Sequence, residues 1–218
     1  MTSFPGSPRL LKGGLVTLDP ESGAVDRIIS LQYNPDTLTR QLQVQGAGDA
    51  GERSEALRLN GPPVETFRFE AEIDATDQLE HPREHPDAVE VGLQPILCAL
   101  EILVYPSSET LQSNASMAAN GLIEILPAQA PLTVFVWSKH RVTPVRLTDF
   151  SITEEAFDAA LNPIRATVSL TLRVLNVNDV GLNHRAGSLY LSYQQQKEQL
   201  ARRHQGGSLG SLGLSSLP

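Results

Sequence analysis

Cysteine is almost absent from the chain: Cys98 is the single one among 218 residues. One cysteine cannot close an intrachain disulfide and supplies no metal-binding thiol pair, so nothing in the sequence points to an oxidising compartment. No histidine or lysine stands next to Cys98, which predicts a small core residue rather than a reactive thiol. The chain also lacks a signal-peptide pattern at its start and any run of about 18 apolar residues. We therefore expect a cytoplasmic protein with no membrane partner.

Positive charge is scarce as well. The 17 Lys and Arg residues are outnumbered by 25 Asp and Glu residues, which gives a formal net charge of -8. The sequence has no basic stripe of the kind that releases counterions from nucleic acid. Nucleic acid is therefore not an expected partner.

A glycine motif near the middle of the first half lacks the context that nucleotide binding requires. Residues 46–51 read GAGDAG and match G-x-G-x-x-G. A dinucleotide site needs a buried strand before these glycines and a helix after them. Three of the eight residues in the preceding segment, 38–45, are glutamine, and Asp49 and Glu52 would repel a phosphate. Residues 46–64 are therefore expected to form a flexible acidic loop that joins two strands.

Two other chemical motifs also lack their context. The G-x-S-x-G match at residues 206–210 lies in a Gly/Ser/Leu tail, whereas a nucleophile elbow needs a strand before it and a helix after it. His81 and His85 have a metal-binding spacing only on a helix. Pro82 and Pro86 disfavour that helix and indicate a solvated turn. We therefore predict no enzyme activity, no metal and no cofactor.

Alternation of apolar and polar residues dominates the sequence and predicts β-strands. In the fourth expected strand the apolar face is made by Phe67, Phe69, Ala71 and Ile73. Its other face is made by Arg68, Glu70, Glu72 and Asp74. This pattern is typical of an antiparallel sheet with one face in water or against a partner. Seven strands are expected, at residues 9–18, 25–33, 38–45, 65–74, 132–137, 143–155 and 164–175.

Three segments depart from the strand period. Apolar residues recur at three- and four-residue steps between Pro95 and Pro106, which predicts a helix. Residues 107–121 are polar and are expected to form a loop. Residues 186–204 predict a weakly amphipathic helix, and residues 206–218 a mobile tail. The fold expected from these patterns is mainly β, of the α+β class. A β-rich acidic chain without convergent chemistry favours a structural subunit that assembles through its sheet edges.

Three stretches resemble the tube-type domain of contractile injection systems. ISLQYNPDTLTR (29–40) is similar to the family's Asn-Pro turn, and ETFRFEAEIDATD (65–77) resembles the strand that follows it. LTDFSITEEAFDAALNPIRATVSLTLRVL (147–175) resembles the family's closing hairpin. The order and spacing of the three stretches carry the resemblance, which covers about residues 9–175.

Two turns lie within these stretches. The first contains Tyr33, Asn34 and Pro35, and the second contains Asn162 and Pro163 at the start of the last strand. Proline fixes φ near -65° and an asparagine side chain bonds nearby backbone, so both turns are predicted to redirect the chain. Their expected role is architectural and not catalytic.

The resemblance implies a tube-type split β-barrel of two antiparallel sheets with one flanking helix, within residues 1–176. Residues 177–218 then form a C-terminal extension with a helix and a flexible tail. Many relatives carry a LysM domain at this end, and residues 177–218 do not show its βααβ pattern. We therefore expect a LysM-lacking member, in which the helix and tail take the place of that domain.

Within this family the chain is most similar to the baseplate hub, or tube-initiator, proteins of extracellular contractile injection systems. The resemblance implies a non-enzymatic homohexameric ring that joins the spike protein to the inner tube protein and initiates the tube. The baseplate wedge and the sheath are further expected partners. Such a ring is assembled in the cytoplasm into a phage tail-like particle.

Two polar faces are expected to line the lumen of such a ring or to meet the next subunit. One is made by Arg68, Glu70, Glu72 and Asp74. The other is made by Thr39, Gln41, Gln43 and Gln45. A plain solvated sheet face is the alternative for each residue. Two alternative functions stay open: an inner tube subunit or tail terminator of a phage-like particle, and a small-ligand-binding or hydrolytic β-barrel protein.

Overall fold

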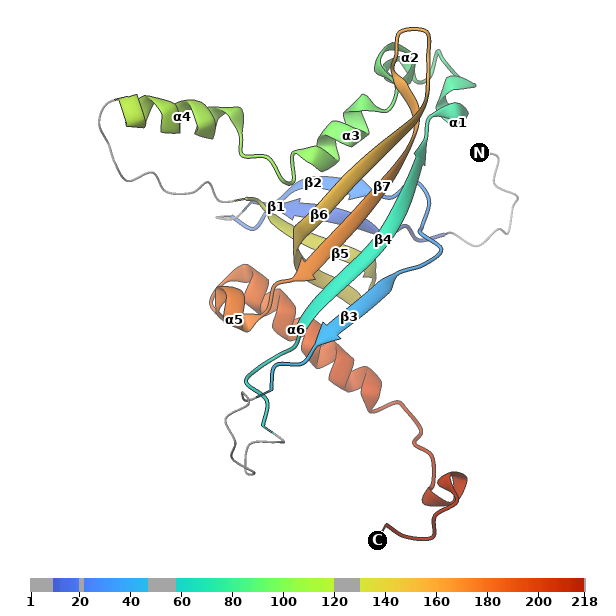
Figure 1. Cartoon of the computed structure of the whole chain (residues 1–218), viewed down its shortest axis with the longest axis vertical. Helices are drawn as coiled ribbons and strands as arrows, with labels where there is room; N and C mark the ends of the chain where they lie inside the picture. Colours follow the sequence, from blue (N-terminus) through green and yellow to red (C-terminus); the bar gives the residue numbers. More distant parts are fainter. Residues whose placement is uncertain (1–9, 20–21, 47–57, 120–129, 218) are drawn as a thin grey trace.

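The computed structural model describes residues 10–19, 22–46, 58–119 and 130–217. These parts contain the strands β1 (Gly14–Leu18), β2 (Val25–Ser30), β3 (Thr39–Gln43), β4 (Val64–Asp74), β5 (Leu132–Ser138), β6 (Arg141–Phe157) and β7 (Pro163–Val174). They form one antiparallel sheet in the order β2-β1-β5-β6-β7-β4-β3 (Figure 1). Because β2 and β3 do not pair with each other, the sheet is not closed. The fold is mainly β, of the α+β class, as the sequence predicts.

Six α-helices accompany this sheet within the described residues. They are α1 (Thr76–Leu79), α2 (Pro86–Val91), α3 (Gln94–Glu101), α4 (Ser108–Ala119), α5 (Val177–Val180) and α6 (Arg185–Ala201). A 3-10 turn, η1 (Leu209–Leu212), follows near the C-terminus. The chain therefore has more helices than the one flanking helix and the C-terminal helix that were expected.

The seven predicted strands all have a counterpart in the structure, and their bounds differ by at most five residues. Strand β4 shows the predicted alternation most clearly. Its buried side chains are Phe67, Phe69, Ala71 and Ile73. Its neighbours Arg68, Glu70 and Glu72 are exposed, and Asp74 is half-buried. A shift of one residue would bury these charges, so the hydrophobic pattern fixes the register.

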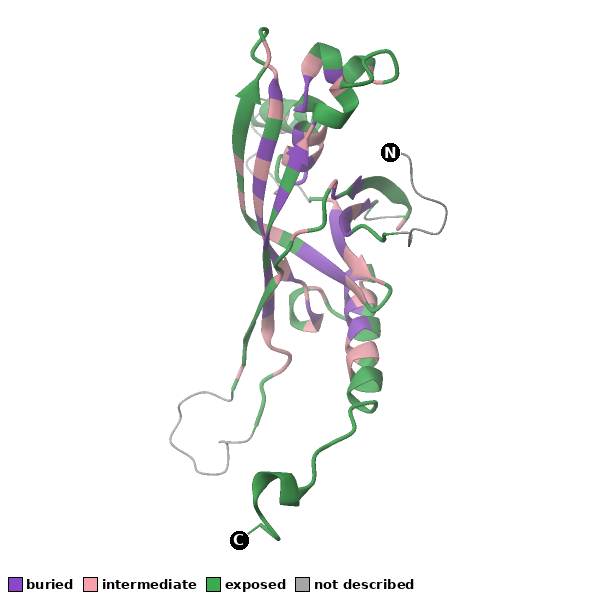
Figure 2. Cartoon of the chain, turned by 90° about the vertical axis from the view of Figure 1, so that its right-hand side faces the viewer, coloured by how far each residue is buried: buried purple, intermediate pink, exposed green. Residues whose placement is uncertain are grey.

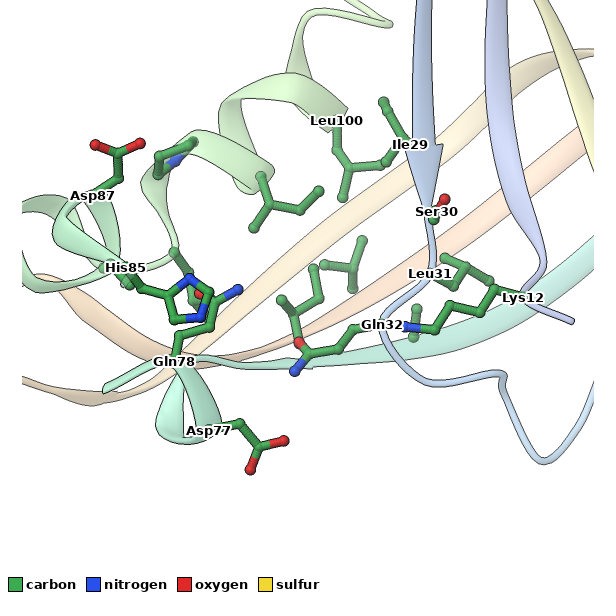
Figure 3. Close-up of a pocket in the computed structure, with 18 of the residues that line it drawn as sticks. Lys12, Ile29, Ser30, Leu31, Gln32, Asp77, Gln78, His85, Asp87 and Leu100 are labelled. Carbon is green, nitrogen blue, oxygen red and sulfur yellow. The ribbon is translucent and has the colours of Figure 1, made fainter. Parts of the chain in front are cut away.

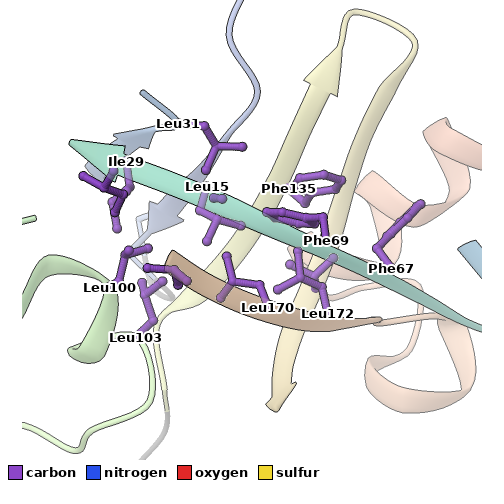
Figure 4. Packing of buried hydrophobic residues seen from close by; sticks show 14 of the residues in the cluster. Leu15, Ile29, Leu31, Phe67, Phe69, Leu100, Leu103, Phe135, Leu170 and Leu172 are labelled. Atoms are coloured by element: carbon purple, nitrogen blue, oxygen red, sulfur yellow. The ribbon is translucent and has the colours of Figure 1, made fainter. Parts of the chain in front are cut away.

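The sheet bends back on itself around an aromatic cluster. Two strands, β6 and β7, lie between β5 and β4 in the sheet. The ring centroid of Phe135 in β5 nevertheless lies 5.3 Å from that of Phe67 and 5.5 Å from that of Phe69, both in β4 (Figure 4). Such contacts require the two halves of the sheet to face each other. The core lies between these halves and is closed by Leu97 and Leu100 of α3.

Strand β6 connects the two halves. Its residues from Arg141 to Val145 pair with β5 on one side, whereas the rest of the strand pairs only with β7. The register shifts between Leu147 and Asp149, where a bulge increases the local bend. One long strand therefore belongs to both halves of the bent sheet.

The loop predicted for residues 107–121 is wrong, because this segment contains the helix α4. Ser107 begins it: its hydroxyl accepts a hydrogen bond from the backbone N–H of Thr110 at 3.1 Å. Glu109 adds negative charge to the first turn, which favours a helix start. The helix buries no residue and extends away from the sheet (Figure 1). Because nothing is buried, no apolar period marked it in the sequence.

The core position predicted for Cys98 is also wrong, since its side chain is exposed. Helix α3 buries the stripe formed by Leu93 before its first turn, Leu97 and Leu100. These residues follow one another at steps of four and three, and Cys98 lies beside this stripe. The predicted helix between Pro95 and Pro106 is therefore present but ends at Glu101, earlier than expected.

Helix α6 corresponds to the helix predicted for residues 186–204, and it packs on the sheet through Ala186, Tyr190 and Tyr193. Gly187 allows this packing, because a Cβ atom there would lie 1.9 Å from the carbonyl oxygen of Gly181. Any side chain at Gly187 would push α6 away from the turn after α5. None of the helices in the described parts of the chain is both long and apolar enough to cross a bilayer.

Candidate functional site

The most extensive functional candidate is a polar surface on the strands β6, β7, β4 and β3. It faces the viewer in Figure 1, and no helix lies in front of it. Buried and more exposed residues alternate along β4 and β7 (Figure 2), whereas every residue of β3 is exposed. We call this surface the polar face; it comprises Asp149, Ser151, Thr153 and Glu155 of β6, Arg165, Thr167, Ser169 and Thr171 of β7, Arg68, Glu70, Glu72 and Asp74 of β4, and Thr39, Gln41 and Gln43 of β3.

The structure brings the two predicted polar faces together. Thr39 lies opposite Arg68 and Gln41 lies opposite Thr66 in the register of β3 and β4. The side chains of Thr39, Gln41 and Gln43 therefore continue the surface made by Arg68, Glu70, Glu72 and Asp74. Gln45 lies just beyond β3, and its carbonyl accepts the backbone N–H of Asn60 at 2.9 Å. Its side chain is half-buried.

The sequence analysis did not predict the centre of the polar face, which is rich in hydroxyl groups. Thr167, Ser169 and Thr171 of β7 lie opposite Thr153, Ser151 and Asp149 of β6. The signal was present, because β7 alternates small polar residues with buried Val168 and Leu170. Pairing between β6 and β7 then decides that their polar residues share one surface.

An ion pair lies at one end of the polar face. The Arg165 Nε atom donates to the Asp74 Oδ2 atom at 3.0 Å, and Glu155 lies opposite Arg165 on the neighbouring strand. The hydrogen bond and charge of Asp74 raise the pKa of Arg165, and the charges of Glu155 and Glu72 add to this effect. The end near the β6–β7 turn is therefore acidic, with Arg165 among three carboxylates.

Burial acts to raise the pKa of the Asp74 carboxyl, but other interactions outweigh it. The hydroxyl and backbone N–H of Thr76 and the guanidinium of Arg165 donate to the carboxylate, and the net effect lowers its pKa. A lowered carboxyl pKa stabilises the fold fully above the unfolded value of about 3.9, and this stabilisation is lost as the pH falls through the folded value.

We expect Asp74→Asn to reduce the acid sensitivity of the fold. The free energy of unfolding of the unsubstituted protein should fall more between pH 5 and pH 2.5 than that of the variant, by less than about 1 kcal/mol because the pair is partly exposed. Urea titrations at both pH values measure this difference. Equal losses in the two proteins would mean that Asp74 has no part in the acid response.

Free strand edges border the polar face on both sides. Within the described residues, β3 pairs with β4 alone. In the described parts of the chain, β6 pairs with β7 alone after Val145. The outer N–H and C=O groups of β3 and of the second half of β6 are therefore available to other strands.

The first predicted turn fastens the segment before β1. The Asn34 Oδ1 atom accepts the backbone N–H of Gly13 at 2.8 Å, and its Nδ2 atom donates to the carbonyl of Leu11 at 2.8 Å. Tyr33 is exposed and Pro35 is half-buried in the same turn. The side chain of Asn34 therefore links the end of β2 to the start of the chain's first strand.

The second predicted turn fastens the helical segment over the core. The Asn162 Nδ2 atom donates to the carbonyl of Glu90 at 3.0 Å and to the Asp158 Oδ2 atom at 2.9 Å. Pro163 is buried, and its carbonyl accepts the backbone N–H of Leu93 at 2.9 Å. The turn between β6 and β7 is thereby connected to both ends of the link between α2 and α3.

A buried carboxylate holds α6 against the opposite, apolar face of β4. Glu65 is 2% exposed. Its Oε1 atom accepts a hydrogen bond from the Tyr193 hydroxyl at 2.9 Å, and its Oε2 atom accepts one from the Lys197 Nζ atom at 2.7 Å. The Arg40 Nε atom of β3 lies 3.8 Å from Oε1. Glu65 therefore connects the C-terminal helix to the edge of the sheet.

Tyr193 is kept protonated by this environment. Burial raises the pKa of the Tyr193 hydroxyl, and the charge and hydrogen bond of Glu65 raise it further. The hydroxyl therefore remains a donor to the carboxylate at physiological pH. Sequence reasoning missed this cluster, although Glu65 shares the strand parity of the buried Phe67. Its partners Tyr193 and Lys197 lie 128 and 132 residues further along the chain.

The chemical motifs of the sequence form no site in the described parts of the chain. The GAGDAG match lies outside the described residues except for Gly46, which bridges to Leu59. His81 is exposed in the predicted turn between α1 and α2. Among the residues that the structure describes, no three His, Cys, Asp or Glu side chains gather as a metal site requires.

Comparison with family models and with curated proteins finds no match for this chain. The features that bear on function are therefore the polar face, its two free edges and the resemblance seen in the sequence.

Proposed function

We propose that this chain is a non-enzymatic structural subunit of a contractile injection system baseplate. In this proposal it forms a ring that joins the spike to the inner tube and initiates tube assembly. One observation carries the proposal: an uncovered polar face lies between two strands with free edges. An isolated subunit leaves these edges unsatisfied, whereas a ring of identical subunits pairs them.

Strand direction supports closure of such a ring. The four strands β6, β7, β4 and β3 are consecutive and antiparallel. Because their number is even, β3 of one subunit runs opposite to β6 of the next subunit when the two are related by rotation. An antiparallel pair is thus produced at every junction without any change in the fold.

The distribution of side chains gives this ring an inside and an outside. The apolar faces of β4 and β7 are covered by the other half of the sheet and by α3 and α6. The polar face is thus the surface left to line a water-filled lumen. In this interpretation the two facing halves of the bent sheet are the two sheets of a tube-type split barrel, and β3 and β6 are where neighbours join.

The partners follow from the resemblance and remain part of the proposal. They are five further copies of the chain, the inner tube protein, the spike protein, and the baseplate wedge or sheath, within a particle assembled in the cytoplasm. An inner tube subunit or a tail terminator shares the same polar face and edges. These alternatives differ in how far the assembly grows, because a tube subunit polymerises alone into long tubes.

Proline on the β3 edge should abolish ring formation. The N–H groups of adjacent residues in a strand point in opposite directions, so one of Gln41 and Leu42 directs its N–H away from β4. Proline at that position should leave the melting temperature unchanged. That variant should be monomeric at concentrations at least about tenfold above those at which the unsubstituted protein forms rings. Mass photometry and negative-stain microscopy measure the assembly state. Ile28→Pro on the edge strand β2 is the matched control, because the register places its N–H on the side away from β1, and it should still form rings.

Two results would contradict the proposal. The first is a strictly monomeric unsubstituted protein, also when the inner tube protein is added. The second is ring formation that both β3 variants retain. Long tubes formed by the pure protein would instead identify an inner tube subunit.

A further inference from the structure

An apolar groove opens between β2 and the helical segment that includes α1, α2 and α3 (Figure 3). Its volume is about 570 Å³, which is within the usual range for pockets that bind a ligand or a peptide anchor. Its interior is aliphatic and includes Ile29, Leu31, Ile73, Leu93, Leu100 and Leu170. The groove therefore suits uncharged, branched side chains.

The four Lys and Asp/Glu side chains that line this groove, Lys12, Asp77, Glu84 and Asp87, are all exposed to solvent. Lys12 lies on the side of β2, and Asp77 and Asp87 lie on the side of the helices (Figure 3). None of the aliphatic side chains of the interior offers a partner to a buried charge. A suitable occupant is therefore a segment that carries several aliphatic side chains and no charge.

The chain itself contains such a segment near its C-terminus. Residues 205–217 include no charged side chain. Leu212 and Leu217 are 74% and 70% exposed, and Leu209 and Leu214 are about 40% exposed. We call residues 208–217 the leucine turn. Among the residues that the structure describes, the leucine turn buries none of its own, and Leu212 and Leu217 are mostly open to solvent.

The leucine turn has an ordered backbone in spite of this exposure. The Ser208 hydroxyl accepts the N–H of Ser211 and thereby caps η1. Gly213 follows in the left-handed conformation with φ 73°, and the N–H of Leu214 donates to the carbonyl of Leu209 at 3.0 Å. These bonds form a Schellman motif, which brings the leucines on both sides of the turn together. A preformed turn loses little conformational entropy when it binds.

The leucine turn and the groove lie toward opposite ends of the molecule. The groove lies near α1 and α2, whereas the chain after α6 leads away from them (Figures 1 and 2). The residues from Ala201 to Leu209 span at most about 28 Å when extended, and they leave α6 on the side away from α1 and α2 (Figure 1).

We propose that the leucine turn of one copy binds in the apolar groove of a second copy. The leucines at 209, 212 and 214 enter the groove and displace water from its aliphatic interior. The contact joins different surfaces of the two copies, so each subunit both donates a turn and receives one. This contact uses neither β3 nor β6, and it is therefore independent of the ring closure proposed above.

Cross-linking between two single-cysteine proteins tests this contact. Both proteins carry Cys98→Ser; one carries Leu217→Cys at the end of the leucine turn, and the other carries Gln78→Cys in the lining of the groove. After mixing, a short bismaleimide should give a covalent heterodimer at least about tenfold faster than with Ala159→Cys, an exposed site outside the groove. Leu212→Ser with Leu214→Ser in the first protein should remove this advantage. These exposed leucines are not part of the core, so the fold is unaffected.

The outcome separates the second copy from other occupants. A heterodimer yield that is the same for Gln78→Cys and Ala159→Cys overturns the proposal, as does a yield that the two serine substitutions leave unchanged. Fast cross-linking only when both cysteines are in one chain, with a monomeric product, shows binding within a subunit and also overturns it. A proline variant in β3 that prevents rings but keeps the heterodimer separates this contact from ring closure.

Discussion

Phe135→Ala should destabilise the protein by about 3–5 kcal/mol, because it removes the side chain that joins the two halves of the sheet. Phe135 is fully buried, with its ring centroid 5.3 Å from that of Phe67 and 5.9 Å from that of Trp137. The loss combines the transfer of a large apolar group with a cavity that neighbouring strands cannot fill. Denaturant titration followed by circular dichroism measures the free energy of unfolding.

Two control variants define this effect. Phe135→Leu keeps much of the volume and should cost about 1–2 kcal/mol. Tyr105→Ala removes an aromatic side chain that is 65% exposed and should change the stability by less than about 0.5 kcal/mol. If Phe135→Ala and Tyr105→Ala had similar effects, packing between the halves would not be the main source of stability.

Lys197→Met should destabilise the protein by about 3 kcal/mol, because it removes the nearest cation from a buried carboxylate. The Lys197 Nζ atom lies 2.7 Å from the Glu65 Oε2 atom, and Glu65 is 2% exposed. Lys197 is itself 31% exposed, which places the expected cost at the low end for buried pairs. Tyr193→Phe leaves the pair intact but removes a hydrogen bond to a charged group, and it should cost about 1–3 kcal/mol.

Combining substitutions separates the charge from the packing. Glu65→Leu together with Lys197→Met removes both charges and should be less destabilising than Lys197→Met alone. Lys139→Met, at an exposed hairpin position, is the matched control and should have little effect. A double variant that is as unstable as the sum of its single variants would show that Glu65 and Lys197 do not interact.

Strand positions could be predicted from the sequence because each one leaves a local trace. Phe67 and Phe69 alternate with Arg68 and Glu70 along a single strand, and burial of one face follows from that pattern alone. Helix α4 left no such trace, since its side chains contact no core. Its start depends instead on a cap at Ser107, whose type is equally common in loops.

The assembly surface was predictable only in part. Each strand's polar residues can be read from the sequence, but the partner of each strand cannot. The predicted faces in β3 and β4 become one surface because Thr39 pairs with Arg68, and Ser169 joins them through β7. The free edge of β6 was not foreseen, because it results from the end of β5 pairing at Val145.

The continuity of β6 determines how the protein unfolds. Because one backbone supplies partners to β5 near its start and to β7 along most of its length, neither half of the sheet can melt while the other keeps its hydrogen bonds and core. Loss of order in one half raises the free energy of the other at once. Heat should therefore disrupt the whole sheet in a single cooperative step.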